Sequence, residues 1–320
     1  MRFVAAAPQA IKGAAAIIRE GGLVAFPTET VYGLGADALS PLAVVRIFEV
    51  KNRPRFDPLI LHIADFSWLK EVCSSTGQKA VKLMERFWPG PLTLVLPKTQ
   101  VVPDIVTAGL PTVAVRMPAH PVALELIREA GTPIAAPSAN PFGYLSPTTA
   151  EHVREQIGEK VDLILDGGPC PVGVESTVID LTEAEPTLLR PGGLPIEEIE
   201  KTIGQLRIGT SHPLKPHSPG QLSRHYAPQT PVRILEDQGF DLKIGKKAGL
   251  LAFRSPKENL PYKMVEVLSP GGDLREAAAK LFSCLHKLDR AGLEVIYAEP
   301  VPEVGLGRAI MDRLKKMKHA

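Results

Sequence analysis

Short apolar runs, bounded by glycine, proline and polar residues, divide the first two thirds of the chain into alternating strands and helices. Short continuous apolar runs are typical of buried strands, whereas apolar positions at a 3.6-residue period indicate helices, which often begin with proline and end at glycine. Buried strands are predicted at 23–26, 59–63, 93–96, 113–117, 134–136 and 163–165, helices at 41–50 and 121–129, and a half-exposed strand at 174–181. This alternation predicts an α/β domain with a large mixed sheet over residues 1–209.

Residues 210–231 interrupt this pattern, because their serine, histidine, proline and glycine residues leave no periodic apolar face. Proline-rich composition of this kind is typical of an extended, fairly stiff linker. Beyond it the alternation resumes, with strands predicted at 232–235, 249–253, 265–268 and 295–298 and helices at 274–288 and 308–317. The sequence therefore predicts a second, smaller α/β domain over residues 232–320.

The composition of the 320 residues is that of a globular protein, with 44% hydrophobic and 22% charged residues. A net charge of +2 gives no overall attraction to nucleic acid, so any basic surface must be local. No run approaches the roughly 20 apolar residues of a membrane span, and the alanine-rich start ends like a glycine-capped helix rather than a signal peptide. Cys73, Cys170 and Cys284 show no zinc or disulfide spacing, so a reducing, cytoplasmic location is expected.

Cationic residues follow the helix predicted at 41–50. Lys51, Arg53 and Arg55 lie close together, a density that suits a polyanion better than a neutral metabolite, although a solvated loop face is the alternative. Pro54 stiffens this segment, and we expect the Lys51 and Arg53 side chains to lie on a loop where substitution leaves folding intact. Arg116 lies inside an apolar run and must pair with an anion there, either a structural carboxylate or part of a substrate.

Other polar residues in apolar segments have both functional and structural interpretations. His62, inside a strand, is more often a core residue than a ligand in such a setting, and Ser176 could be a cross-strand polar residue and no more. Ser138 and Asn140 share one side of an extended segment. Residues 33–38 match G-x-G-x-x-A, but no helix starts inside these glycines, as a dinucleotide site requires. The sequence contains no P-loop and no metal-ligand spacing. It also contains no G-x-S-x-G motif, so covalent catalysis by a serine nucleophile is unsupported.

Several of these segments, taken together and in order, resemble the YrdC-type threonylcarbamoyl-AMP synthase family in its long, two-domain form. The matching segments are 27–35, Lys51 with Arg53, Ser138 with Asn140, 172–180, 189–192, the linker segment 218–228 and the closing helix 305–314. The resemblance spans essentially the whole chain. It implies a YrdC-like twisted mixed sheet with helices in the first domain and a Rossmann-like second domain.

The resemblance also implies a nucleotidyltransferase reaction, in which L-threonine, bicarbonate and ATP give threonylcarbamoyl-AMP and pyrophosphate. The product would feed threonylcarbamoyladenosine formation in tRNA, through a separate transferase complex. By resemblance, threonine is held by Thr30, His62, Arg116 and Ser176, and ATP by Lys51, Arg53, Thr112, Ser138, Asn140, Ser146, Arg190 and Tyr226. Lys51 and Arg53 would also be the catalytic residues, and Mg²⁺ would arrive on the triphosphate rather than in a cage of protein ligands.

The linker carries Arg224, His225 and Tyr226, a high density of ligand-capable side chains for a spacer. We expect it to fold over the active site and to exclude water from the adenylate; a passive tether is the alternative. A module that binds double-stranded RNA or tRNA without catalysis is a second candidate function, with strongly salt-dependent affinity. Carbamoyl chemistry in hydrogenase maturation is a third, but it would need cysteine-rich zinc fingers that three scattered cysteines cannot form.

Overall fold

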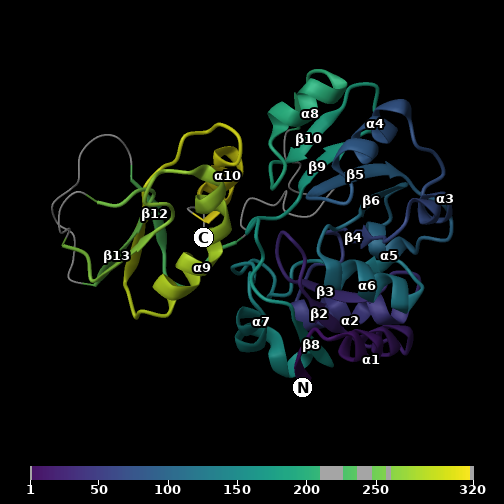
Figure 1. The fold of residues 1–320 in the computed structure, drawn as a ribbon, viewed down its shortest axis with the longest axis horizontal. Coiled ribbons are helices and arrows are strands. Elements are labelled where there is room, and N and C mark those ends of the chain that lie inside the picture. The colour runs from purple at the N-terminus through teal and green to yellow at the C-terminus, as the bar shows by residue number, and fades with distance from the viewer. Residues whose placement is uncertain (1, 210–225, 236–246, 257–260, 318–320) are drawn as a thin grey trace.

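The computed structural model describes residues 2–209, 226–235, 247–256 and 261–317. Two α/β units lie side by side, a large one from the first part of the chain and a small one from the last part (Figure 1). The large unit contains an eleven-stranded sheet and the small unit a four-stranded sheet. The predicted fold class, a large mixed sheet with a smaller α/β unit after it, is therefore confirmed.

The large sheet has the strand order β1-β8-β2-β3-β7-β4-β6-β5-β9-β10-β11. Its strands are β1 (Arg2–Ala5), β2 (Val24–Phe26), β3 (Gly33–Asp37), β4 (Ile60–His62), β5 (Leu92–Pro97), β6 (Thr112–Arg116), β7 (Ile134–Ala135), β8 (Leu163–Asp166), β9 (Thr177–Asp180), β10 (Thr187–Arg190) and β11 (Arg207–Ile208). The sheet is mixed, because it contains parallel pairs such as β4 with β6 and antiparallel pairs such as β2 with β3.

Helices cover both faces of the large sheet. They are α1 (Pro8–Arg19), α2 (Pro41–Lys51), α3 (Leu69–Val72), α4 (Gln78–Phe87), α5 (Asp104–Thr107), α6 (Pro121–Ala130), α7 (Ala150–Ile157) and α8 (Ile196–Ile203), with short 3₁₀ turns at Phe66–Trp68 and Gly158–Lys160. The apolar sides of α2, α4, α7 and α8 join one core, and those of α1 and α6 join a second core on the opposite face. The central strands are therefore buried on both faces, which is why they read as continuous apolar runs.

The small unit has a parallel sheet in the order β12-β15-β13-β14. Its strands are β12 (Val232–Ile234), β13 (Ala248–Ala252), β14 (Met264–Val267) and β15 (Val295–Ala298), and its helices are α9 (Leu274–Asp289) and α10 (Gly307–Met317). Both helices lie on the side of this unit that faces the large one (Figure 1). Its core also includes Val31, Leu145 and Val174 of the large unit, so apolar packing continues across the boundary.

One segment has an element that was not predicted, and another differs from its predicted form. Residues 33–37 of the G-x-G-x-x-A match form strand β3, whose glycines pack against the Phe26 ring, so no helix starts inside these glycines. The strand predicted as half-exposed at 174–181 is shorter, and each residue of β9 is buried. That prediction was wrong because β9 lies between β5 and β10, in the interior of the sheet.

The contact between the two units is close and partly polar. His152 of α7 stacks on His286 of α9, with ring centroids 3.9 Å apart and planes inclined by 25°. Burial lowers the pKa of His152 to about 3 and that of His286 to about 4, so both rings are neutral at pH 7 and stack without repulsion. The ion pairs of Arg290 with Glu155 and of Arg308 with Glu197 flank this contact.

Gly173 lies at this boundary and has two reasons to be glycine. Its φ is +75°, and a Cβ at this position would lie 2.4 Å from the Cα of Ala279 in α9. We therefore expect Gly173→Ala to lower the free energy of unfolding by about 2 kcal/mol or more, through backbone strain and displacement of α9. Urea unfolding followed by circular dichroism measures this.

Gly13→Ala is the matched control. Gly13 is in the middle of α1, and no described atom lies within 4 Å of the Cβ that alanine would add. This substitution should raise stability by about 0.5–1 kcal/mol, because glycine is a poor helix former. Equal effects of the two substitutions would contradict the close approach at Gly173.

Candidate functional site

A polar pocket opens where the loop after β2 meets β4, β6 and the loop after β7, with β9 and β10 opposite. Eight of the predicted binding residues line it: Thr30, Arg53, His62, Arg116, Ser138, Ser176, Arg190 and Tyr226. Four others lie behind or beside the pocket wall: Lys51, Thr112, Asn140 and Ser146. Arg224 and His225 lie outside the described residues. Tyr226, the described member of the predicted lid, is buried with a positive φ of 65°.

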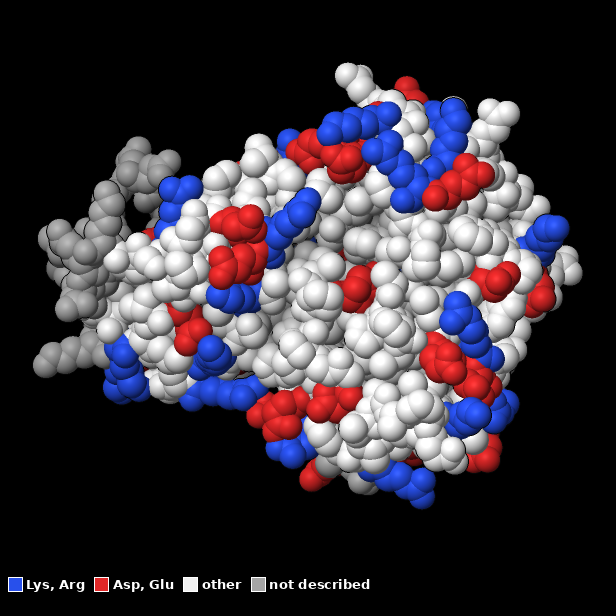
Figure 2. All heavy atoms as spheres, viewed as in Figure 1, with Lys and Arg blue, Asp and Glu red and all other residues white. Residues whose placement is uncertain are grey.

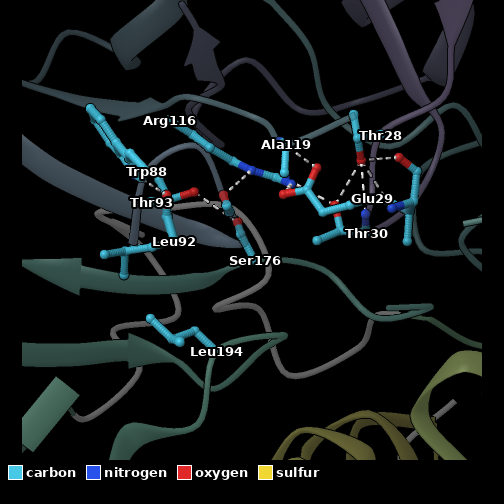
Figure 3. A network of polar contacts seen from close by, with 12 residues as sticks. Thr28, Glu29, Thr30, Trp88, Leu92, Thr93, Arg116, Ala119, Ser176 and Leu194 are labelled. Carbon is cyan, nitrogen blue, oxygen red and sulfur yellow. Dashed lines mark hydrogen bonds and ion pairs between the residues drawn. The ribbon is translucent and has the colours of Figure 1, made fainter. Parts of the chain in front are cut away.

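The loop between β2 and β3 is held by the hydroxyl of Thr28. Its Oγ1 accepts hydrogen bonds from the backbone N–H of Thr30 at 3.1 Å and of Val31 at 3.2 Å, and it donates to the carbonyl of Val31 at 2.6 Å. The Thr30 hydroxyl lies 2.8 Å from Thr28 Oγ1 (Figure 3). A short polar turn thereby presents Thr30 to the pocket in a fixed orientation.

Arg116 is the buried cation at the end of β6, and a structural carboxylate pairs with it. Its Nη2 donates to Glu29 Oε1 at 2.5 Å, its Nη1 to Thr30 Oγ1 at 2.9 Å and its Nε to the carbonyl of Gly90 at 3.2 Å. Glu29 also accepts from the backbone N–H of Ala119 at 3.0 Å (Figure 3). These contacts use three of the five N–H donors of the guanidinium, which leaves two for a ligand.

A second buried cluster forms the opposite wall, from β5, β9 and β10. The hydroxyls of Thr93 and Ser176 lie 2.7 Å apart, and Arg190 Nη2 donates to the carbonyl of Ser176 at 3.0 Å and to its hydroxyl at 3.2 Å. All three side chains are buried. The cluster therefore adds a hydroxyl and a guanidinium to the pocket that Arg116 also lines.

Lys51 and Arg53, which the sequence predicts to lie on a loop, are both held inside the protein. Lys51 is the last residue of α2, and its Nζ donates to the carbonyls of Ser138, at 2.6 Å, and Asn140. Arg53 follows the helix and forms an ion pair with Asp57 at 2.8 Å. Both side chains are buried. The loop prediction was wrong for Lys51, which ends a helix, and right for Arg53. Because both side chains are buried and hold backbone carbonyls in place, we expect substitution at either position to affect folding.

The environment of Lys51 also shifts its pKa. Burial, together with the positive charge of Arg53, lowers the pKa of Lys51 well below its ordinary value. Its two carbonyl partners belong to the segment that carries Ser138 into the pocket. Asn140 braces the same loop, since its Nδ2 donates to the carbonyls of Pro141 and Tyr144, both at 2.9 Å. Lys51 and Asn140 therefore position the wall of the pocket from behind.

His62 lies at the end of β4, between Arg116 and the Phe26 ring. Burial, with the nearby charge of Arg116, lowers the pKa of His62 to about 3, so the imidazole is neutral. Its Nδ1 is buried and has no hydrogen-bond partner within the described ranges. A buried ring nitrogen without a partner at the edge of a pocket is a group that a ligand can satisfy.

Three carboxylates of this region were visible in the sequence but received no role there: Glu29, Asp57 and Glu175. Each is buried beside an arginine. Within the part of the chain that the structure describes, no group of three or more His, Cys, Asp and Glu residues could hold a metal ion. The signal that could have indicated these carboxylates is the presence of arginines in apolar runs, which need a partner of opposite charge.

Comparisons with known proteins cover nearly the whole chain. The family model for Sua5, YciO and YrdC proteins, described as telomere recombination, matches residues 16–192, and a model described as threonylcarbamoyl-AMP synthase, C-terminal domain, matches residues 194–317. The chain is 51% identical to the threonylcarbamoyl-AMP synthase of Pyrococcus abyssi, over 96% of this chain and 93% of that protein. It is 45% identical to that of Bacillus subtilis, over 96% and 92%.

Solved structures give the same result. The crystal structure of Pyrococcus abyssi Sua5 complexed with L-threonine has a TM-score of 0.90 and 49% sequence identity, and it covers 99% of this chain and 96% of that one. E. coli YciO has a TM-score of 0.53 and 28% identity over 60% of this chain and 94% of its own. Among the described helices, none is both long and apolar enough to cross a membrane.

The buried pair of Arg53 and Asp57 leads to a stability prediction. Arg53→Ala should lower the free energy of unfolding by about 3–5 kcal/mol, because Asp57 is left buried without the arginine that pairs with it, whether it stays ionised or takes up a proton. The neutral double variant Arg53→Met with Asp57→Asn removes both charges and should recover most of this loss. Urea unfolding of the three proteins measures it. If Arg53→Ala unfolds like the wild type, Asp57 does not depend on this arginine.

Proposed function

The chain belongs to the Sua5, YciO and YrdC family, in the two-domain form of its threonylcarbamoyl-AMP synthases, and on this premise we propose how its pocket makes threonylcarbamoyl-AMP. The substrates are L-threonine, bicarbonate and ATP, and the products are the adenylate and pyrophosphate. The observation that carries the proposal is the pocket itself, which brings Arg53, Arg116 and Arg190 together with the hydroxyls of Ser138 and Ser176. Such a set suits a carboxylate and a polyphosphate held next to each other.

We assign the threonine end of the pocket to Thr30, His62, Arg116 and Ser176. Arg116 is oriented by Glu29 and by Thr30, and its remaining N–H groups suit the substrate carboxylate. His62 is neutral and its Nδ1 is without a partner among the described residues, so it can accept a hydrogen bond from the threonine hydroxyl or ammonium. The hydroxyls of Thr30 and Ser176 line the same pocket and can contact the bound threonine.

We assign the ATP end to Arg53, Ser138, Arg190 and Tyr226 within the pocket, with Lys51, Asn140 and Ser146 bracing the wall behind them. Thr112 begins β6 and is only half-buried, which leaves room for contact with a ligand at the rim. Mg²⁺ enters as part of the ATP complex, a proposal supported by the lack of a cage of protein ligands among the described residues.

The chemistry needs positioning rather than a protein nucleophile. The amino nitrogen of threonine forms a bond to the carbon of bicarbonate, and water is lost, which gives a carbamate. An oxygen of this carbamate then attacks the α-phosphorus of ATP in line, and the bond from that phosphorus to the bridging oxygen breaks as pyrophosphate leaves. Arg53 and Arg190 are placed to neutralise the charge that develops on the phosphates, and the buried site excludes water from the adenylate.

A transferase complex that places the threonylcarbamoyl group on tRNA is the downstream partner we propose, and the cytoplasm is the location where such a tRNA would be met. The alternative of an RNA-binding module without catalysis has less support. On the face drawn in Figure 2, Lys and Arg are interspersed with Asp and Glu over both units. A basic stripe typical of RNA-binding modules is not visible on that face.

Substrate dependence tests the synthase activity. Pyrophosphate release from Mg–ATP should require both L-threonine and bicarbonate, and α-labelled ATP should give a new adenylate on thin-layer analysis. Serine should be a poor substrate, because it lacks the methyl group of threonine, and contact of that methyl group with the pocket is worth roughly 1–3 kcal/mol of discrimination. ATP turnover that is indifferent to threonine would contradict the proposal, and tight, salt-dependent RNA binding without turnover would favour the alternative.

Arg116→Lys tests the assignment of the threonine end. An ammonium cannot reproduce the planar fork of a guanidinium on a carboxylate, so the dissociation constant for threonine should rise about ten-fold or more, with little change for ATP. Separate calorimetric titrations of the two ligands measure this. Equal losses for both ligands would assign Arg116 to the phosphates or to a purely structural pair with Glu29.

A further inference from the structure

Arg313 of the second unit reaches the wall of the pocket in the first. It belongs to α10, in the closing segment whose role the proposed reaction leaves open, and its side chain has 0% exposure. Its Nε donates to Glu175 Oε2 at 2.8 Å and its Nη1 to the carbonyl of Pro191 at 3.0 Å. Its guanidinium carbon also lies 4.8 Å from the centre of the Tyr226 ring. One side chain of the small unit therefore contacts three segments of the site.

Among the described residues that line the pocket, Glu175 is the sole carboxylate. Its second oxygen, Oε1, accepts from the hydroxyl of Ser146 at 2.5 Å, so the carboxylate bridges the two units. Burial would raise the pKa of Glu175, but the positive charges of Arg313 and Arg190 outweigh burial and lower it. Glu175 is therefore negative at neutral pH, on the same wall as Arg190 and next to Ser176.

We propose that Arg313 is a positioning residue for the nucleotide, which compensates the charge of Glu175 and fixes Tyr226 at the ATP end of the pocket. This inference rests on the proposed function and assigns to the second unit a part in the same site. When a triphosphate enters the pocket, the positive charge of Arg313 offsets the negative charge of Glu175. Without Arg313, the carboxylate of Glu175 would repel the phosphates, and this repulsion is strong because the effective dielectric constant in the pocket is low.

The contacts of Tyr226 support the second half of this proposal. Its ring packs on Phe282 of α9, with centroids 5.9 Å apart, and on Arg313 of α10. The next residue, Ala227, donates its N–H to the carbonyl of Gly143 at 2.7 Å. Tyr226 is therefore fixed between both helices of the small unit and a loop of the large one, with its ring at the pocket.

The test separates Arg313 from the rest of α10. The variants are R313M, R313K, E175Q and the neutral pair E175Q/R313M. The control is R308M, which removes an arginine of the same helix that forms a half-exposed pair with Glu197 at 3.3 Å. Each protein is titrated with Mg²⁺ and α,β-methylene-ATP, which cannot release pyrophosphate, and separately with L-threonine. Thermal melting reports folding.

R313M should weaken binding of the analogue on the order of ten-fold, as expected when one member of a coupled buried pair is removed. Its threonine affinity should change by less than about two-fold, and so should both affinities of R308M, since an exposed pair contributes little. R313K retains the charge and should be intermediate. Adding E175Q to R313M should restore most of the analogue affinity, because Glu175 then carries no charge and Asp312 keeps its ion pair with Lys316.

A purely structural role predicts a different pattern. Equal weakening of both ligands by R313M, or failure of E175Q to restore analogue binding, would overturn the proposal. If R313M does not fold, analogue binding by E175Q is compared with that by E175Q/R313M. Much weaker binding by the double variant would also overturn the proposed role of Arg313. Normal analogue and threonine binding by a wild type that makes no adenylate would overturn the synthase proposal alone.

Discussion

Buried charge is the constraint on which this pocket depends. The pairs are Arg53 with Asp57, Arg116 with Glu29 and Arg313 with Glu175, and all six side chains are buried. A lone buried charge is costly, whereas a paired and hydrogen-bonded one can be held in a fixed orientation away from water. The pocket can therefore present cations to anionic ligands without first rearranging them, which is the condition for electrostatic catalysis in a transfer of this type.

The fold could be predicted from the sequence where apolar patterning alone determines structure. Buried strands such as β4 and β6, and helices such as α2 that begin with proline, have unambiguous local signals. Strand β3 could not be predicted, because its Gly-x-Gly pattern is that of a turn and becomes a strand only by pairing with β2 and β7. The burial of β9 likewise depends on its neighbours in the sheet, which a local pattern does not contain.

The same limit applies to the site. Residues in recognisable motifs, such as Ser138, Ser176 and Arg190, do meet in one pocket. Their partners could not be paired from the sequence, because Glu29 and Arg116 lie 87 positions apart, and Glu175 and Arg313 lie 138 apart. Arg53 shows a related error, since a polar, proline-containing segment indicates a surface loop, yet its side chain is buried beside Asp57. Whether these charged side chains are buried depends on partners that only the folded chain brings together.

The position of Arg313 has a consequence for how this chain can change over time. Glu175 and Arg313 are encoded far apart and in different units, yet loss of either changes the charge balance at the other. Without Arg313, Glu175 would rely on the nearby charge of Arg190, and without Glu175, Arg313 would rely on Asp312. Substitutions at the two positions are therefore tolerated chiefly as a matched pair. In this chain, loss of the small unit would therefore leave the pocket residue Glu175 without the arginine that pairs with it.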